Sequence, residues 1–293
     1  MTDHADLTDP TRPHVAAVMT VFNRKDDTLA CLQSLHQQGG TRARITTFVV
    51  DDGSTDGTAD AVAERFPDVR LLPGTGELYW NGGMRRAFGA ALAEGFDFYW
   101  WLNDDVELDD DALTRLLDTD HAIRHDGVGP VILVGAMRHP DDGRTTYGGV
   151  RRHSQLRPLD FSLVEPSDRP VPVETMNGNC VLIPKEIAHN LGNIEPSYRQ
   201  KMGDFDYGLR ARQAGYAVWS AAGTLGRCAT HPPRRTDTGP LWGEIRRLWS
   251  TKELPPRSWL VFTRRWAGPL WPVYWLSPYV RRAAALIAER LRR

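Results

Sequence analysis

The chain has 293 residues, of which 41% are hydrophobic and 25% are charged, and its formal net charge is −1. This composition predicts a packed core and excludes a largely disordered chain. The length suits one large domain, or a domain with an appendage. No nucleic-acid partner is expected.

The three cysteines, Cys31, Cys180 and Cys228, are scattered and have no metal-ligand spacing. Their small, odd number favours a reduced, cytosolic setting. Residues 1–13 are polar, lack an apolar signal core and are expected to form a flexible tail. No stretch meets the criteria for a membrane-spanning helix.

Strand-like and helix-like patterns alternate along the first two-thirds of the chain, which indicates βαβ units and an α/β fold with a mostly parallel sheet. Apolar residues at helical spacing, such as Leu29, Leu32 and Leu35, predict the helices. In chain order we expect a strand at 15–22, a helix capped by Asp26, a strand at 45–50, a helix capped by Asp56, a strand at 69–72, a helix around 84–92, a strand at 98–102 and a helix at 111–117.

The pattern becomes less regular after Gly127. We expect strands at 128–134, 175–183 and 217–220 and a helix at 204–214. The stretch 151–172 is rich in proline and charge and is predicted to form a long loop near the substrate side.

Polar residues lie at the ends of two of these predicted strands. Asp51 ends the second strand, and Asn103, Asp104 and Asp105 follow the strand at 98–102. Carboxylates at the C-terminal ends of strands lie where α/β sheets bind ligands, and hard cations such as Mg²⁺ or Mn²⁺ prefer oxygen ligands. The alternative is that the acidic turn only caps the next helix.

A glycine pair precedes the helix around 84–92. Two glycines allow a close approach of the backbone to a ligand, so Asn81 and Gly83 are candidate ligand contacts. A simple connector is the alternative.

Four segments, in the right order, resemble glycosyltransferase family 2, whose members are inverting enzymes with a GT-A fold. The resemblance spans about residues 14–220 and implies a nucleotide-binding half at about 14–106 and an acceptor half at about 107–240. The segments are Val18-Met19-Thr20-Val21-Phe22-Asn23-Arg24, Val50-Asp51-Asp52-Gly53-Ser54-Thr55-Asp56, Leu102-Asn103-Asp104-Asp105-Val106 and Gly203-Asp204-Phe205-Asp206-Tyr207-Gly208-Leu209-Arg210.

The resemblance implies roles at the donor site. Thr20 and Phe22 would line the nucleotide pocket, and Asp51 would bind the base. Asp105 aligns with the metal-binding aspartate of the D-x-D motif, which implies a divalent metal, Mn²⁺ or Mg²⁺. The first position of that motif is Asn103, an amide that can hydrogen-bond ribose but brings no charge.

At the acceptor side, Asp204 aligns with the general base, while Gly203 stands where glutamate is more usual. Asp104 occupies the variable position of D-x-D and is a further candidate for donor binding. His231 is a candidate third metal ligand, and a surface histidine in a proline-rich loop is the alternative.

Residues 241–293 carry eleven Lys or Arg against three acids, together with six of the ten tryptophans. Basic amphipathic helices with tryptophan at their edges suit a membrane interface. A helical lid on the catalytic domain and a dimer interface remain alternatives.

The expected protein is therefore an inverting, rhamnosyltransferase-like enzyme. It would transfer a sugar from a nucleotide sugar, such as dTDP-rhamnose or a UDP-sugar, to a glycan or lipid-linked acceptor in polysaccharide synthesis. A cytoplasmic location, with peripheral contact to the inner face of the cell membrane, would suit such an acceptor. The alternatives are a sugar-phosphate nucleotidylyltransferase, which would need a basic glycine-rich loop near the first strand, and a non-catalytic membrane-associated binding protein.

Overall fold

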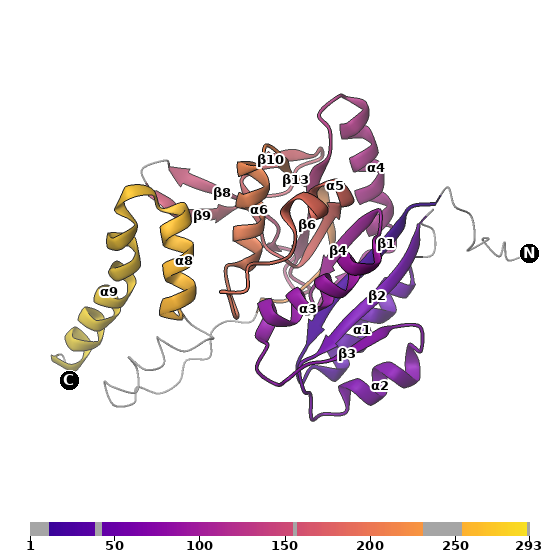
Figure 1. The fold of residues 1–293 in the computed structure, drawn as a ribbon, viewed down its shortest axis with the longest axis horizontal. Helices are drawn as coiled ribbons and strands as arrows, with labels where there is room; N and C mark the ends of the chain where they lie inside the picture. The colour runs from indigo at the N-terminus through magenta and orange to yellow at the C-terminus, as the bar shows by residue number, and fades with distance from the viewer. Residues whose placement is uncertain (1–11, 39–42, 155–156, 231–253, 292–293) are drawn as a thin grey trace, which may run out of the picture.

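The computed structural model describes residues 12–38, 43–154, 157–230 and 254–291 (Figure 1). The central sheet has the strand order β10-β13-β6-β12-β4-β1-β2-β3, and these eight strands run in one direction except β10 and β12. Its strands are β1 (His14–Val21), β2 (Arg44–Asp51), β3 (Arg70–Pro73), β4 (Phe98–Leu102), β6 (Val131–Arg138), β10 (Val171–Val173), β12 (Cys180–Pro184) and β13 (Ala217–Arg227), with β5 (Glu107–Leu108) and β7 (Thr145–Tyr147) paired to β13 and β6.

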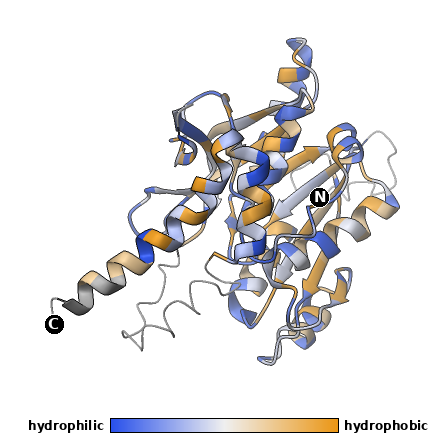
Figure 2. Ribbon diagram, turned by 60° about the vertical axis from the view of Figure 1, so that its left-hand side comes forward, coloured by the Kyte–Doolittle hydropathy of each residue, from blue (hydrophilic) through white to orange (hydrophobic). Residues whose placement is uncertain are grey.

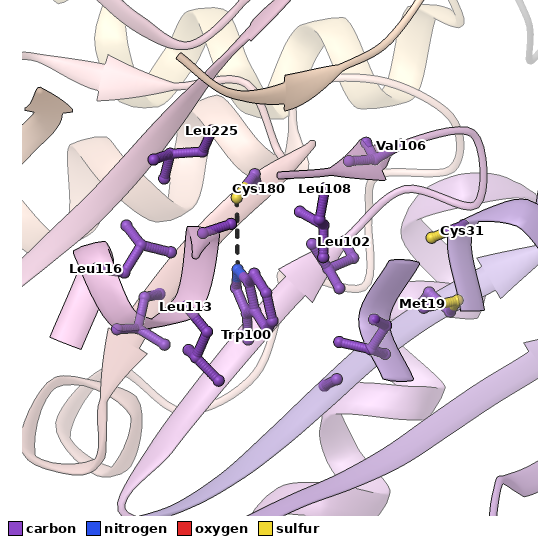
Figure 3. Packing of buried hydrophobic residues seen from close by; sticks show 14 of the residues in the cluster. Met19, Cys31, Trp100, Leu102, Val106, Leu108, Leu113, Leu116, Cys180 and Leu225 are labelled. Atoms are coloured by element: carbon purple, nitrogen blue, oxygen red, sulfur yellow. Dashed lines mark hydrogen bonds between the residues drawn. The ribbon is translucent and has the colours of Figure 1, made fainter. Parts of the chain in front are cut away.

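Helices cover both faces of this sheet, and adjacent tryptophans of β4 mark the two cores. Trp100 packs in the core under α1, α2 and α4, where its Nε1 donates to Cys180 Sγ (Figure 3). Trp101 points to the opposite core, under α3, α5 and α6. The helices are α1 (Lys25–His36), α2 (Thr58–Arg65), α3 (Tyr79–Glu94), α4 (Ala112–His125), α5 (Lys185–Leu191) and α6 (Gly203–Gln213).

The expected long loop at 151–172 is wrong. Most of it forms strands of a second, three-stranded sheet and the edge strand β10. The second sheet has the order β11 (Thr175–Met176), β8 (Gly149–Ser154), β9 (Arg157–Leu163). The predicted strand at 175–183 is likewise two strands, β11 and β12, separated by a turn at 177–179.

The helices open without the side-chain caps that we expected. Helix α1 has Arg24 at its N-cap, and Asp26 lies in the first turn instead. Asp56 lies just before the N-cap of α2, where its carboxylate accepts a hydrogen bond from the backbone N–H of Thr58.

The C-terminal extension forms α8 (Pro256–Trp266), a short 3₁₀ turn η1 (Gly268–Leu270) and α9 (Trp271–Leu291). These helices lie beside α6 and β9, on the side away from β2 and β3 (Figure 1). Within the described residues, no helix is long and apolar enough to cross a bilayer. Hydrophobic and hydrophilic segments alternate along α9, whereas the central strands are predominantly hydrophobic (Figure 2).

Candidate active site

Strands β1, β2 and β4 end at one edge of the sheet. Val21 pairs with Asp51 in register, and β4 runs parallel to β1 and ends at Leu102. The expected donor-site residues therefore gather at this edge. Phe22 lies just past β1 and is 49% exposed, an unusual position for a large aromatic ring.

A partly buried charge cluster occupies the same edge. Arg24 Nη1 lies 2.5 Å from Asp105 Oδ2 and 3.4 Å from Asp104 Oδ1. The Cys228 thiol donates to Asp105 Oδ1 over 3.4 Å. Burial, reinforced by the charge of Asp105, raises the pKa of Asp104 to about 7.

Two neighbouring aspartates on β2 and its following turn organise the loops around this edge. Asp51 Oδ1 accepts from the backbone N–H of Ser54. Asp52 accepts from the N–H groups of Thr75, Gly76 and Tyr79, at 2.8 to 3.1 Å. Asp52 thus fixes the loop that leads into α3.

Asp204 lies in the first turn of α6, facing the turn between β11 and β12. Its Oδ2 accepts from Gly178 N–H over 3.0 Å, and its Oδ1 accepts from Phe205 N–H over 2.9 Å. Burial raises the pKa of Asp204 to about 6, and these two hydrogen bonds oppose that rise. A carboxylate with this pKa is suited to accept a proton near neutral pH.

Trp80 connects the two groups of residues. Its Nε1 donates to Asn103 Oδ1 over 2.7 Å. Its ring covers Gly178, where an added Cβ would lie 2.6 Å from the ring and 3.2 Å from Asp204 Cβ. Trp80 therefore forms a wall that runs from the turn after β4 to the candidate base.

Asn81 and Gly83, the expected donor contacts at the start of α3, are both buried in packing. Asn81 is 1% exposed, and its Nδ2 donates to Lys201 O over 3.0 Å. A Cβ on Gly83 would collide with the Thr20 side chain, so this glycine permits close packing of α3 on β1. The Thr20 hydroxyl in turn donates to Val50 O over 3.2 Å and faces α3.

The departure at position 203 has a structural reason. A Cβ on Gly203 would collide with Asn81 Oδ1. The Asn81 side chain fills the space next to the base that a larger residue at position 203 would need.

The comparison with known families decides the relationship. A sequence model of the family described as Glycosyl transferase family 2 matches residues 16–176, more than half of the chain. The chain belongs to glycosyl transferase family 2.

This family 2 glycosyltransferase resembles two curated mycobacterial proteins. It is 29% identical over 205 residues to N-acetylglucosaminyl-diphospho-decaprenol L-rhamnosyltransferase of Mycobacterium tuberculosis, covering 60% of this chain and 64% of that protein. It is 25% identical over 248 residues to galactofuranosyltransferase GlfT2 of Mycolicibacterium smegmatis, covering 75% of this chain and 38% of that protein. The match thus spans less than two-thirds of either relative's length.

Two solved structures confirm the GT-A fold. The mannosyltransferase PcManGT of Pyrobaculum calidifontis, in complex with GDP-Man and Mn²⁺, has a TM-score of 0.53 and 19% identity, covering 96% of this chain and 75% of that one. S. aureus TarS 1-349 has a TM-score of 0.53 and 15% identity, covering 74% and 60%.

The side chains at the sheet edge fit a divalent ion in part. Among the residues that the structure describes, no group of three or more His, Cys, Asp or Glu is placed to hold a metal. Asp104 and Asp105 nevertheless offer the hard oxygen ligands that Mg²⁺ and Mn²⁺ prefer, and a ligand diphosphate could complete the shell. The expected third ligand, His231, lies outside the described residues.

Sequence reasoning missed three residues of the site. Arg24 closes the first segment that resembles the family, where a cation shortly after a strand was a usable signal, and Trp80 directly precedes Asn81; neither was assigned a role. Nothing in the sequence placed Cys228 beside Asp105, 123 positions away.

Proposed function

We propose that this protein is an inverting glycosyltransferase that moves a sugar from a nucleoside-diphosphate sugar to a hydroxyl group of a glycan or lipid-linked acceptor. The observation that carries the proposal is Asp204. A desolvated carboxylate with a pKa of about 6 lies near one end of the Trp80 side chain, and the other end bonds to Asn103 in the turn that carries Asp105. Trp80 therefore connects the base with the candidate diphosphate site.

In this mechanism Asp204 accepts the proton of the acceptor hydroxyl as the oxygen attacks the anomeric carbon. A single displacement inverts the configuration and needs no enzyme nucleophile. Gly178 N–H and Phe205 N–H hold the carboxylate in place. The Arg24 guanidinium, beside Asp105, can pair with the leaving diphosphate.

A divalent ion held by Asp104 and Asp105 would offset the charge of the leaving diphosphate as a Lewis acid. Hard divalent cations bind oxygen ligands, which the two carboxylates supply. The Mn²⁺ in the PcManGT complex also supports this assignment.

For the donor we propose a deoxythymidine- or uridine-diphosphate sugar, with dTDP-rhamnose as the first choice. The named activity of the rhamnosyltransferase relative supports this choice. The exposed Phe22 ring offers an apolar surface to a base, and Asp51 offers a carboxylate beside it.

A thermal-shift screen tests donor binding. We expect dTDP-rhamnose or a UDP-sugar with Mn²⁺ to raise the melting temperature. If no nucleoside diphosphate or nucleotide sugar stabilises the protein, the donor proposal fails.

A transfer assay tests the base. Asp204→Asn should lower kcat by about 10²–10⁴-fold and leave the donor-induced thermal shift intact. Asp110→Asn, the same change at an exposed turn, is the matched control. Retained turnover in Asp204→Asn would remove Asp204 as the base.

We also propose that α9 contacts an anionic membrane surface on the cytoplasmic side, where a lipid-linked acceptor would be found. Four apolar residues on one side of η1 and α9 are 50–63% exposed, and exposed Arg281 and Arg282 lie beside them. The only acid in the described part of the extension is Glu289. The apolar residues are Leu270, Val273, Leu276 and Val280.

Three tryptophans of the extension use their Nε1 groups in hydrogen bonds within the protein. Trp259 Nε1 donates to Tyr274 O, Trp275 Nε1 to Pro256 O and Trp266 Nε1 to Asp206 Oδ1. These side chains hold the helices together and against the catalytic domain. Trp242 and Trp249 lie outside the described residues.

Vesicle flotation tests the membrane contact. The full chain should bind vesicles containing phosphatidylglycerol and not neutral ones, and Val273→Asp with Leu276→Asp should abolish binding. Ala285→Asp, off this face, is the control. If the double variant instead converts a dimer to a monomer in sedimentation, a second copy covers the face and the membrane proposal is overturned.

A further inference from the structure

Asp206 is a fully buried carboxylate that the proposed reaction does not use. It lies two residues after the base, in the first turn of α6, and is 0% exposed. Two partners come from α8: Arg265 Nη1 donates to both carboxylate oxygens at 2.8 and 3.1 Å, and Trp266 Nε1 donates over 2.9 Å. Tyr198 OH donates over 3.0 Å, and Arg210 Nε lies 3.0 Å away.

The same face of α8 holds the segment that precedes α6. Arg265 Nη2 pairs with Glu195 over 3.1 Å, and Ser258 Oγ donates to Ser197 O over 2.8 Å. The Tyr198 ring packs edge-on against Phe262 in a separate apolar cluster between α8 and α6. The segment 195–202 is therefore fixed to the extension on one side.

On its other side, this segment holds the start of α3. Arg199 O accepts from Asn81 N–H over 2.8 Å, and Gln200 Oε1 accepts from Trp80 N–H over 3.3 Å. Trp80 then reaches Asn103 at the donor edge. The contacts run without interruption from α8 to the turn after β4.

The segment ends at a strained residue. Met202 has φ 78°, in the left-handed region, and it is the N-cap of α6. A methionine adopts this conformation only where its surroundings enforce it. The contacts from α8 and α3 are those surroundings, and Asp204 follows two residues later.

We propose that Arg265 is a positioning residue for the catalytic base, so that the C-terminal extension is an integral part of the catalytic unit. Arg265 holds Asp206 and Glu195, and through them fixes the first turn of α6 and the Trp80 wall. The proposal rests on the proposed function of Asp204 as base. Alternate residues of one motif thus have different tasks, with Asp204 facing the reaction and Asp206 facing the extension.

The physical reason is the burial of Asp206. Without Arg265, the fully buried Asp206 carboxylate loses both hydrogen bonds from Nη1 and one of its two cations, while Arg210, Trp266 Nε1 and Tyr198 OH remain. The turn then has to open toward water, because an under-compensated buried charge is costly. Asp204 shares that turn and would become hydrated and misaligned.

Steady-state kinetics of the full chain tests this with Arg265→Gln, against Arg264→Gln on the exposed side of the same helix. We expect Arg265→Gln to lower kcat about 10- to 100-fold and to change the donor KM less than about threefold. The low-pH limb of its kcat/KM profile should move below that of the wild type, because a hydrated Asp204 ionises more easily. Arg265→Lys should recover part of kcat, and Arg264→Gln should behave as wild type.

Hydrogen exchange measured by mass spectrometry gives a readout that does not depend on turnover. Peptides covering 195–206 should exchange at least about tenfold faster in Arg265→Gln than in Arg264→Gln. If Arg265→Gln only reduced the fraction of folded protein, its apparent kcat would fall, but the low-pH limb of its kcat/KM profile would not move. Unchanged exchange in this segment, or an unchanged pH profile with unchanged kcat, would overturn the proposal. If the wild type transfers no sugar, the proposed function fails, while the exchange experiment still decides whether Arg265 fixes the segment.

Discussion

Replacing the candidate base should stabilise the protein. Asp204→Asn keeps the shape of the side chain and removes a charge that burial disfavours. The pKa of Asp204 is about 6, against an ordinary value of 3.8. At about 1.36 kcal/mol per pH unit, this difference corresponds to a cost of at most about 3 kcal/mol for the ionised folded state.

The sign of the effect follows from the two pKa values. Below pH 3.8 the carboxyl is protonated in both the folded and unfolded states, and the wild type pays no cost. Between pH 3.8 and about 6 only the unfolded state ionises, so the wild type loses stability as the pH rises. Above about pH 6 the stability of the wild type no longer falls with pH, because Asp204 is ionised in both states.

The variant keeps an acceptor for only one of the two N–H groups that bond Asp204. We therefore expect a net gain of about 1 to 2 kcal/mol at pH 7.5, shrinking toward pH 4. Urea unfolding at the two pH values measures it. Asp206→Asn, the same change two residues away, should instead cost about 3–5 kcal/mol because it breaks a buried ion pair.

Two outcomes would refute this reasoning. One is an Asp204→Asn variant no more stable than the wild type at pH 7.5. The other is a stability difference that is the same at pH 4 and pH 7.5. Either result would mean that burial does not destabilise the ionised form of Asp204 in the folded protein.

Three further predictions concern the site. The kcat/KM of the wild type should rise with pH and level off above about pH 6, as Asp204 loses its proton; a flat profile from pH 5 to 8 would contradict its role as base. Gly203→Ala should destabilise the protein by about 1–3 kcal/mol through its collision with Asn81, and adding Asn81→Ala should restore stability; thermal unfolding of the single and double variants shows whether the two sites are coupled. Arg24→Ala leaves the two aspartates after β4 without this cation, so Mn²⁺ should raise its melting temperature more than that of the wild type; equal shifts would mean that no metal binds there.

The sheet edge was predictable because its residues follow local patterns. Asp51 and Asp105 each follow an apolar run, and parallel strands bring such positions together. The β-strand at 98–102 was predicted with its observed bounds, since five apolar or aromatic residues between polar ones leave little choice.

The second sheet was missed because its strands carry little hydrophobic alternation. Residues of β9 are half-buried on both faces, so proline and charge dominated the pattern. The turn at 177–179, which separates β11 from β12, does follow a local pattern, since Asn177-Gly178 is a turn dipeptide.

The contacts of Arg24 and Asn81 are made with residues far away in the sequence. Arg24 pairs with residues 80 and 81 positions away, and Asn81 is bonded to the loop around residue 200. Such long-range contacts leave no mark on the local sequence, so burial and pairing had to come from the structure.

The contact between Asn81 and Gly203 has an evolutionary consequence. A side chain at position 203 can be accommodated only when position 81 carries a smaller residue, so substitutions at the two positions should occur together in related chains. A search pattern that demands an acidic residue directly before the base would pass over chains of this kind. A pattern that pairs an amide at position 81 with glycine at position 203 would collect them as a subgroup.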